Sequence, residues 1–178
     1  MAIKPTIYKM RIALSDLERN YYNTLKLTIA QHPSETSERM MARVMAYVIH
    51  AQERLTFTKG LSSVEEPDIW LRSLDDQIEL WIDVGEPDVE RVKKSTRLAQ
   101  KVIVYSFNSK SDVWWAKHQA KLWRLKASIY RLDWQSICKF TELLQRTMSM
   151  SITITGDSAF IAAENGECEV TWEPLQIV

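Results

Sequence analysis

The sequence predicts a single α/β domain over residues 1–178, in which helices flank a mixed central sheet. The length of 178 residues corresponds to about one domain. Segments that alternate apolar and polar residues, as half-buried strands do, are interspersed with segments whose apolar residues recur at helical spacing. Their order is two strands, a helix, three strands, and then helices and strands in turn. This order is not a run of uniform βαβ units, so it predicts a mixed sheet.

Two β-hairpins and a helix are expected in the first half of the chain. The expected strands are residues 6–14, 25–29, 55–58, 69–74 and 77–84. The first two strands predict an opening hairpin, and the last two predict a second hairpin that turns at Asp75 and Asp76. Between the hairpins, apolar residues at helical spacing predict a helix within residues 34–53, and residues 33–35 are suited to its start.

The second half of the chain predicts helices and strands in alternation, followed by a C-terminal hairpin. Pro87, a residue favoured in the first helical turn, begins a helix that is expected to run to about Gln100. Gly156 and Asp157 are a turn signal between the two strands of the C-terminal hairpin. The other expected helices are residues 109–123 and 133–144, and the expected strands are residues 101–107, 127–132, 148–155, 159–162 and 167–172.

Composition excludes several classes of protein. Lys and Arg together number 23, as do Asp and Glu, so a polybasic nucleic-acid coat is excluded while a local basic patch is not. The apolar content of 46% argues against disorder. Cys138 and Cys168 belong to no CxxC motif, which argues against a disulfide framework and a cysteine zinc site. No apolar run has the length of a membrane span, and we expect a cytoplasmic protein with no membrane partner.

The chemistry that the sequence offers lies in its carboxylates, because the dinucleotide, P-loop, HExxH and GxSxG motifs are absent. Asp68 precedes one strand of the second hairpin and Asp83 ends the other. The hairpin therefore predicts that the two side chains lie side by side, although Asp68 is also an ordinary turn residue after Pro67. Two such carboxylates can hold Mg²⁺ or Mn²⁺, and the metal can activate water for phosphate hydrolysis.

A third carboxylate is expected from the first helix. On a helical wheel, Glu38 falls about 60° from Met41, at the border of the apolar face. Glu35 falls at about 120° and is expected to be more exposed. A carboxylate at the border of a buried face needs a metal ion or an arginine as partner. The alternative for Glu38 is a favourable interaction with the helix dipole.

The helix after Asp83 offers a cation. Lys93 and Gln100 are seven residues apart and flank its expected inner stripe, whereas Lys94 points away. Lys93 is therefore the candidate to reach a site at the end of the sheet, and a solvated lysine is the alternative. The four positive charges of residues 91–97 form either a solvated face or a strip that contacts phosphates. The expected inner stripe consists of Val89, Val92, Thr96 and Ala99.

Several segments of the sequence carry a family resemblance. They are HPSETSERMM at 32–41, EPDIWLR at 66–72, LWIDVGEPD at 80–88, RVKK at 91–94 and RTMSM at 146–150. On these segments the chain resembles the bacterial YaeQ family over essentially its whole length. That resemblance implies a variant of the PD-(D/E)XK, restriction endonuclease-like core, with added N- and C-terminal hairpins.

The resemblance also implies site residues. Glu38, Asp68 and Asp83 would bind Mg²⁺ or Mn²⁺, and Gln100 would support them. The lysine that the superfamily carries two positions after the second acid is absent, because position 85 is glycine. Lys93 would then be a migrated substitute that assists the attacking water.

Three functions follow as alternatives. The first is a metal-dependent, nuclease-like phosphodiesterase. The second, favoured by Gly85, is a catalytically inactive relative that binds nucleic acid or a protein partner through the same surface. The third is an interaction protein whose acids are satisfied internally by Arg39 or Arg43. Trp114 and Trp115 either pack in the core or stack on nucleic-acid bases.

Overall fold

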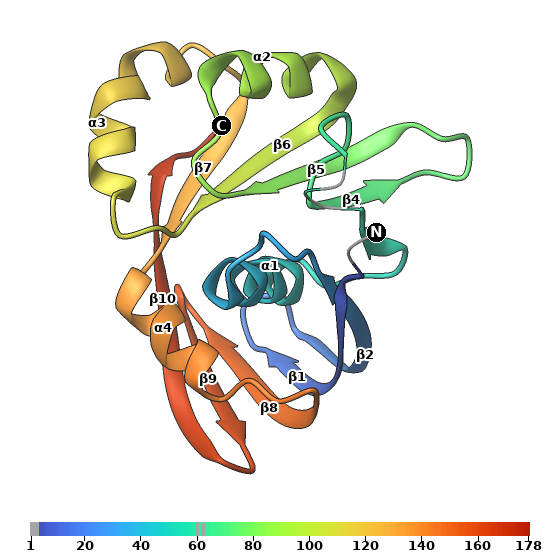
Figure 1. Ribbon diagram of the computed structural model, residues 1–178. Coiled ribbons are helices and arrows are strands. Elements are labelled where there is room, and N and C mark those ends of the chain that lie inside the picture. The colour runs from blue at the N-terminus through green and yellow to red at the C-terminus, as the bar shows by residue number, and fades with distance from the viewer. Residues whose placement is uncertain (1–3, 60, 62) are drawn as a thin grey trace.

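One strongly curved sheet contains all ten strands of residues 4–59, 61 and 63–178, the part of the chain described by this computed structural model (Figure 1). The strands are β1 (Thr6–Asp16), β2 (Tyr21–Gln31), β3 (Leu55–Phe57), β4 (Ile69–Arg72), β5 (Ile78–Val84), β6 (Ala99–Ser106), β7 (Ala127–Leu132), β8 (Thr147–Thr155), β9 (Ser158–Ala163) and β10 (Gly166–Gln176). The helices are α1 (Ser37–Ile49), α2 (Val89–Leu98), α3 (Ser111–Leu122) and α4 (Trp134–Glu142). The order of strands across the sheet is β2-β1-β8-β9-β10-β7-β6-β5-β4-β3. The predicted mixed α/β sheet with flanking helices is therefore confirmed.

The two terminal hairpins are parts of this main sheet. β1 and β2 pair antiparallel, and β8 and β9 pair antiparallel across the turn at Gly156 and Asp157. β1 also pairs with β8 in parallel, with Met10 opposite Met148. The sequence predicted both hairpins, but it did not predict the parallel pairing that joins them into one sheet.

Helix α1 lies inside the curve of the sheet, which wraps around it as a nearly closed barrel (Figure 1). Thr36 caps the helix, because its side chain accepts a hydrogen bond from the backbone N–H of Arg39. Nearly every residue from Met40 to Val48 is buried, and only Tyr47 among them is partly exposed. Burial on nearly all sides is typical of a helix that is enclosed by other elements. α1 therefore forms the centre of the main core.

A second apolar layer lies between the outer face of the sheet and helices α2 and α3 (Figure 1). It contains Trp114, which is 8% exposed and so packs in the core. Helix α2 ends at Leu98, and Gln100 belongs to β6, because Ala99 pairs with Ile78 of β5. The prediction of a helix that reaches Gln100 is therefore wrong at its C-terminal end. None of the helices in the described residues has the length and apolar character needed to cross a membrane.

Candidate functional site

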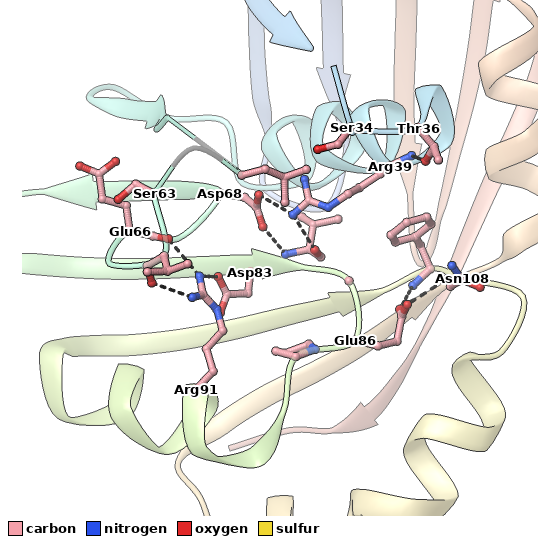
Figure 2. A pocket seen from close by; sticks show the side chains of 16 residues that line it. Ser34, Thr36, Arg39, Ser63, Glu66, Asp68, Asp83, Glu86, Arg91 and Asn108 are labelled. Carbon is pink, nitrogen blue, oxygen red and sulfur yellow. Dashed lines mark hydrogen bonds and ion pairs between the residues drawn. The ribbon is translucent and has the colours of Figure 1, made fainter. Parts of the chain in front are cut away.

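A pocket of about 470 Å³ opens where the β4–β5 hairpin meets the first turns of α1 and α2 (Figure 2). Asp68 and Asp83 both line it. The hairpin brings these two residues together, because Ile69 pairs with Ile82 and the backbone N–H of Asp68 donates to the Ile82 carbonyl at 3.1 Å. The structure thus places the two predicted strand acids in one pocket.

The Asp68 carboxylate is buried and fully engaged by the protein. Its Oδ1 accepts a hydrogen bond from Nη2 of Arg39 at 2.7 Å, and its Oδ2 accepts one from the backbone N–H of Val84 at 2.8 Å. Arg39 Nη2 also donates to the Val84 carbonyl at 3.1 Å. Arg39 therefore ties helix α1 to the start of β4 and to the end of β5.

Asp83 is held by Arg91 from the first turn of α2. Arg91 Nε donates to Oδ2 at 3.1 Å and Nη2 donates to Oδ1 at 3.0 Å, which is a bidentate pair. Burial raises the pKa of the Asp83 carboxyl above its ordinary value, and the nearby charge of Asp68 acts in the same direction. The contact with Arg91 opposes this rise in pKa and favours the ionised carboxylate.

Arg91 also binds the segment that precedes β4. Its Nη1 donates to the Val64 carbonyl at 2.8 Å and its Nη2 donates to the Glu66 carbonyl at 2.9 Å. The sequence predicted a solvated or phosphate-binding strip over residues 91–97 and did not single out Arg91. Its place in the first turn of the helix that follows the Asp83-Val84-Gly85 strand end was the signal that could have found it.

The buried acid at the start of α1 is Glu35, and the expectation that Glu35 is more exposed than Glu38 is wrong. The Glu35 side chain is 2% exposed. It accepts hydrogen bonds from Arg39 Nη1 at 2.6 Å, Arg43 Nε at 2.8 Å and Arg43 Nη2 at 2.7 Å. Residue 35 precedes the cap residue Thr36, so it lies outside the helix and the wheel does not apply to it.

Glu38 does not join Asp68 and Asp83. It is partly exposed in the first turn of α1, it does not line the pocket, and its charge acts on Cys138 of α4. The three carboxylates implied by the family resemblance are therefore not brought together.

Neither Lys93 nor Gln100 reaches the pocket. Both side chains are exposed, and neither residue lines the pocket. Gln100 and Lys93 are not neighbours on one helix face, because Gln100 lies in β6. Lys94 is also exposed, and it pairs with Glu65 at 3.1 Å.

Gly85 lines the pocket at the position where the resemblance implies a lysine. Its φ is +128°, a conformation that residues with a side chain rarely adopt, and an added Cβ would meet no atom within 4 Å. Space for a side chain exists there, but the backbone conformation favours glycine.

A Mg²⁺ or Mn²⁺ ion does not fit this arrangement of donors. All four oxygens of Asp68 and Asp83 already accept hydrogen bonds, three of them from guanidinium groups. No group of three or more His, Cys, Asp or Glu side chains is placed to hold a metal anywhere in the described residues. A cation bound by these carboxylates would have to displace a guanidinium group, that of Arg91 from Asp83 or that of Arg39 from Asp68. The arrangement matches in part the alternative in which Arg39 or Arg43 satisfies the predicted acids. Arg39 does hold Asp68, but Asp83 is held by Arg91, and Arg43 holds Glu35 instead.

Comparison with known proteins adds the family. The family model described as YaeQ protein matches residues 1–172. "Uncharacterized protein YaeQ" of Salmonella typhi is 40% identical over 172 residues, which is 96% of this chain and 95% of the relative. Its namesake in Escherichia coli K12 is 39% identical over 172 residues, with the same coverage of 96% and 95%.

Solved structures agree with this match. The crystal structure of YaeQ protein from Xanthomonas axonopodis pv. citri has a TM-score of 0.94 at 34% identity, and the match covers 98% of this chain and 99% of that one. The crystal structure of YaeQ protein from Pseudomonas syringae has a TM-score of 0.92 at 34% identity, with coverage of 97% and 96%.

Proposed function

The chain belongs to the YaeQ family, and from that membership and the geometry of the pocket we propose that it binds nucleic acid without hydrolysing it. In this proposal the protein is a relative of the PD-(D/E)XK nucleases. The β4–β5 hairpin supports this, because it presents Asp68 and Asp83 together at strand ends, as that core would.

The observation that carries the absence of hydrolysis is the engagement of both acids by arginine. Metal-assisted hydrolysis needs a divalent cation that activates water and neutralises charge on the phosphate. Here the guanidinium of Arg91 occupies the cation position beside Asp83, and Arg39 occupies the one beside Asp68. Position 85 is glycine, so the lysine that would assist the attacking water is absent from this position.

Local positive charge supports nucleic acid as the ligand. The chain has zero net charge, but residues 113–132 contain no Asp or Glu and carry Lys117, Lys121, Arg124, Lys126 and Arg131. On the adjacent helix α2, Lys93 and Arg97 are exposed. Uneven charge of this kind attracts a polyanion although the whole molecule is neutral.

The metal-dependent phosphodiesterase remains the second candidate, because Asp68 and Asp83 share the pocket and the charge of Asp68 acts on the Asp83 carboxyl. It requires that a metal ion, with or without a bound phosphate, displaces Arg91. Arg91 is the more exposed of the two arginines, since its side chain is 31% exposed and that of Arg39 is 18% exposed.

The test measures binding and cleavage on the same labelled single-stranded and duplex DNA and RNA. We expect binding that weakens as salt rises, the mark of phosphate contacts, and no cleavage with Mg²⁺ or Mn²⁺. Calorimetry with either metal alone is expected to show no binding to the wild type or to Asp83→Asn.

Two results would overturn the proposal. Cleavage by the wild type that Asp83→Asn abolishes would establish the phosphodiesterase instead. The absence of any binding at low salt would exclude nucleic acid as the ligand. The variant Arg91→Gln is the matched control for the displacement of Arg91 by a metal ion. It removes the guanidinium group from Asp83 and leaves both carboxylates in place.

A further inference from the structure

We propose that the outer surface of α3 and the turn after it binds single-stranded nucleic acid, and that the indole of Trp123 stacks on a base. We call this surface the α3 face and define it by Lys117, Lys121, Trp123, Arg124 and Lys126, all of which are exposed. The inference deepens the proposed function, on which it rests, and assigns binding to a surface other than the acid pocket.

The cations of the α3 face are not neutralised by the protein. Among the described residues, no acid forms an ion pair with Lys117, Lys121, Arg124 or Lys126. Asp112, the acid at the start of α3, pairs with Arg131 at 2.7 Å and so does not offset them. In the pocket, by contrast, Arg39 and Arg91 are each paired with a carboxylate. Within the part of the chain that the structure describes, the cations of the α3 face are therefore free of carboxylate partners, unlike those of the pocket.

Trp123 is the aromatic group of this surface. It is 70% exposed, whereas Trp114 on the preceding helix is 8% exposed. An indole held in water beside cations is the pairing that single-stranded nucleic-acid sites use, because every base offers a ring face for stacking. A base inside a duplex has both ring faces covered, so stacking on Trp123 favours an unpaired strand.

The turn that carries Trp123 is held rigidly. Nε2 of Gln176 donates to the carbonyls of Leu122, Leu125 and Ala127, at 3.0, 3.3 and 2.8 Å. One buried amide from β10 thus fixes both ends of the turn. Because the backbone that carries the indole is already ordered, less conformational entropy is lost there on binding.

A cavity of about 290 Å³ adjoins Trp123, Arg124 and Lys126, and Gln176 also lines it. Gln176 is 6% exposed, and its Oε1 is a buried acceptor that receives no hydrogen bond from the described residues. A base is a flat ring that can stack on the exposed indole, and Arg124 and Lys126 beside it can contact the adjoining phosphates.

Helix α2 extends the same surface. α2 contacts α3 on the outer side of β5, β6 and β7 (Figure 1). Its exposed Lys93 and Arg97 add positive charge beside the α3 face. The strand would stack at Trp123 and run with its phosphates along these cations.

The experiment measures the affinity of the full chain for a fluorescent oligothymidylate of about 20 nucleotides, with a duplex of the same length as comparison. Trp123→Ala is expected to lower the affinity about 5- to 150-fold, the effect of removing one base–aromatic stack. Phe160→Ala, which removes a 47% exposed aromatic from β9, is the matched control and is expected to change nothing.

Charge reversal tests the phosphate contacts. The pair Lys117→Glu and Lys121→Glu is expected to reduce the slope of log affinity against log salt by about 0.7 for each phosphate that is no longer neutralised. The same change at the exposed Lys9 and Lys26 of the β1–β2 hairpin is the control. All four lysines are exposed, and the two double variants have the same net charge. A difference in binding between them therefore reports the position of the charges and not the total charge or the folding of the protein.

The outcomes separate this inference from the proposed function. If the wild type binds and both α3-face variants bind equally well, the inference is wrong and nucleic-acid binding lies elsewhere. Tighter binding of the duplex than of the single strand would also overturn it. If the wild type binds no nucleic acid, the proposed function itself fails.

Discussion

The free energy of unfolding is expected to depend strongly on Glu35, the buried acid that precedes α1. Its carboxylate is buried against Arg43, whose side chain is 4% exposed. The variant Glu35→Gln keeps the shape of the side chain and removes its charge. Arg43 is then left as a buried cation with no compensating carboxylate, because its remaining hydrogen bond is to the carbonyl of Ala30 at 3.0 Å.

Breaking a buried ion pair in this way costs about 3 to 5 kcal/mol of unfolding free energy. Glu35 accepts three short hydrogen bonds from guanidinium groups, so we expect the cost of Glu35→Gln to lie within that range. Glu38→Gln is the matched control, since Glu38 is partly exposed three residues away. It is expected to change stability by less than about 0.5 kcal/mol.

The assay is urea unfolding at neutral pH, followed by tryptophan fluorescence. With a slope of about 2 kcal/mol per M, Glu35→Gln should lower the midpoint by about 2 M. The double variant Glu35→Met and Arg43→Met should recover part of the stability, because it removes both buried charges. Equal midpoints for Glu35→Gln and Glu38→Gln would refute the reasoning.

Two further predictions concern His50 and Gly85. Burial lowers the pKa of His50 to about 3 from an ordinary 6.5, and its ring contacts the Tyr105 hydroxyl at 2.6 Å. The unfolded chain therefore takes up a proton at His50 below about pH 6.5 while the folded chain does not, so stability falls as pH falls. The wild type should lose about 2 kcal/mol between pH 7 and pH 5 at this residue, and His50→Gln, measured by the same urea unfolding, should lose correspondingly less. Gly85→Ala should cost about 1 to 2 kcal/mol in thermal unfolding through its backbone conformation alone, and an unchanged melting temperature would contradict this.

The closed ion pairs of the pocket explain how two buried carboxylates are tolerated without a metal ion. An isolated buried carboxylate is costly unless it is paired or hydrogen-bonded. Arg39 and Arg91 supply both, and each also donates to backbone carbonyls. The pocket is therefore a junction that joins α1, α2 and the β4–β5 hairpin.

The features that were predicted correctly are those governed by local sequence. The β4–β5 hairpin follows from alternation on both sides of Asp75 and Asp76, and its register then places Asp68 beside Asp83. The start of α4 also follows from local sequence, because the helix was expected from residue 133 and the Asp133 side chain accepts a hydrogen bond from the backbone N–H of Ser136. Short-range hydrogen bonds determine both kinds of feature.

The features that were missed depend on groups brought together from distant parts of the chain. Glu35 is buried because Arg39 and Arg43 of α1 turn toward it inside the curved sheet, and a wheel drawn for an isolated helix contains no such information. Gln100 lies in a strand and not in α2, because the neighbouring Ala99 pairs with Ile78 of β5. In both cases tertiary pairing overrode the local pattern.

By itself the sequence determined the order of strands and helices along the chain, the three hairpins and the presence of an acid at the end of each of two neighbouring strands, because periodicity and turn residues act over a few positions. Only the tertiary structure decided that β1 joins β8, that Arg91 closes on Asp83, and that Trp123 stays in water while Trp114 is buried. These outcomes depend on which surfaces are covered when the sheet closes around α1. Burial is a property of the folded chain. It determines which charged side chains pair with each other and which aromatic rings remain exposed.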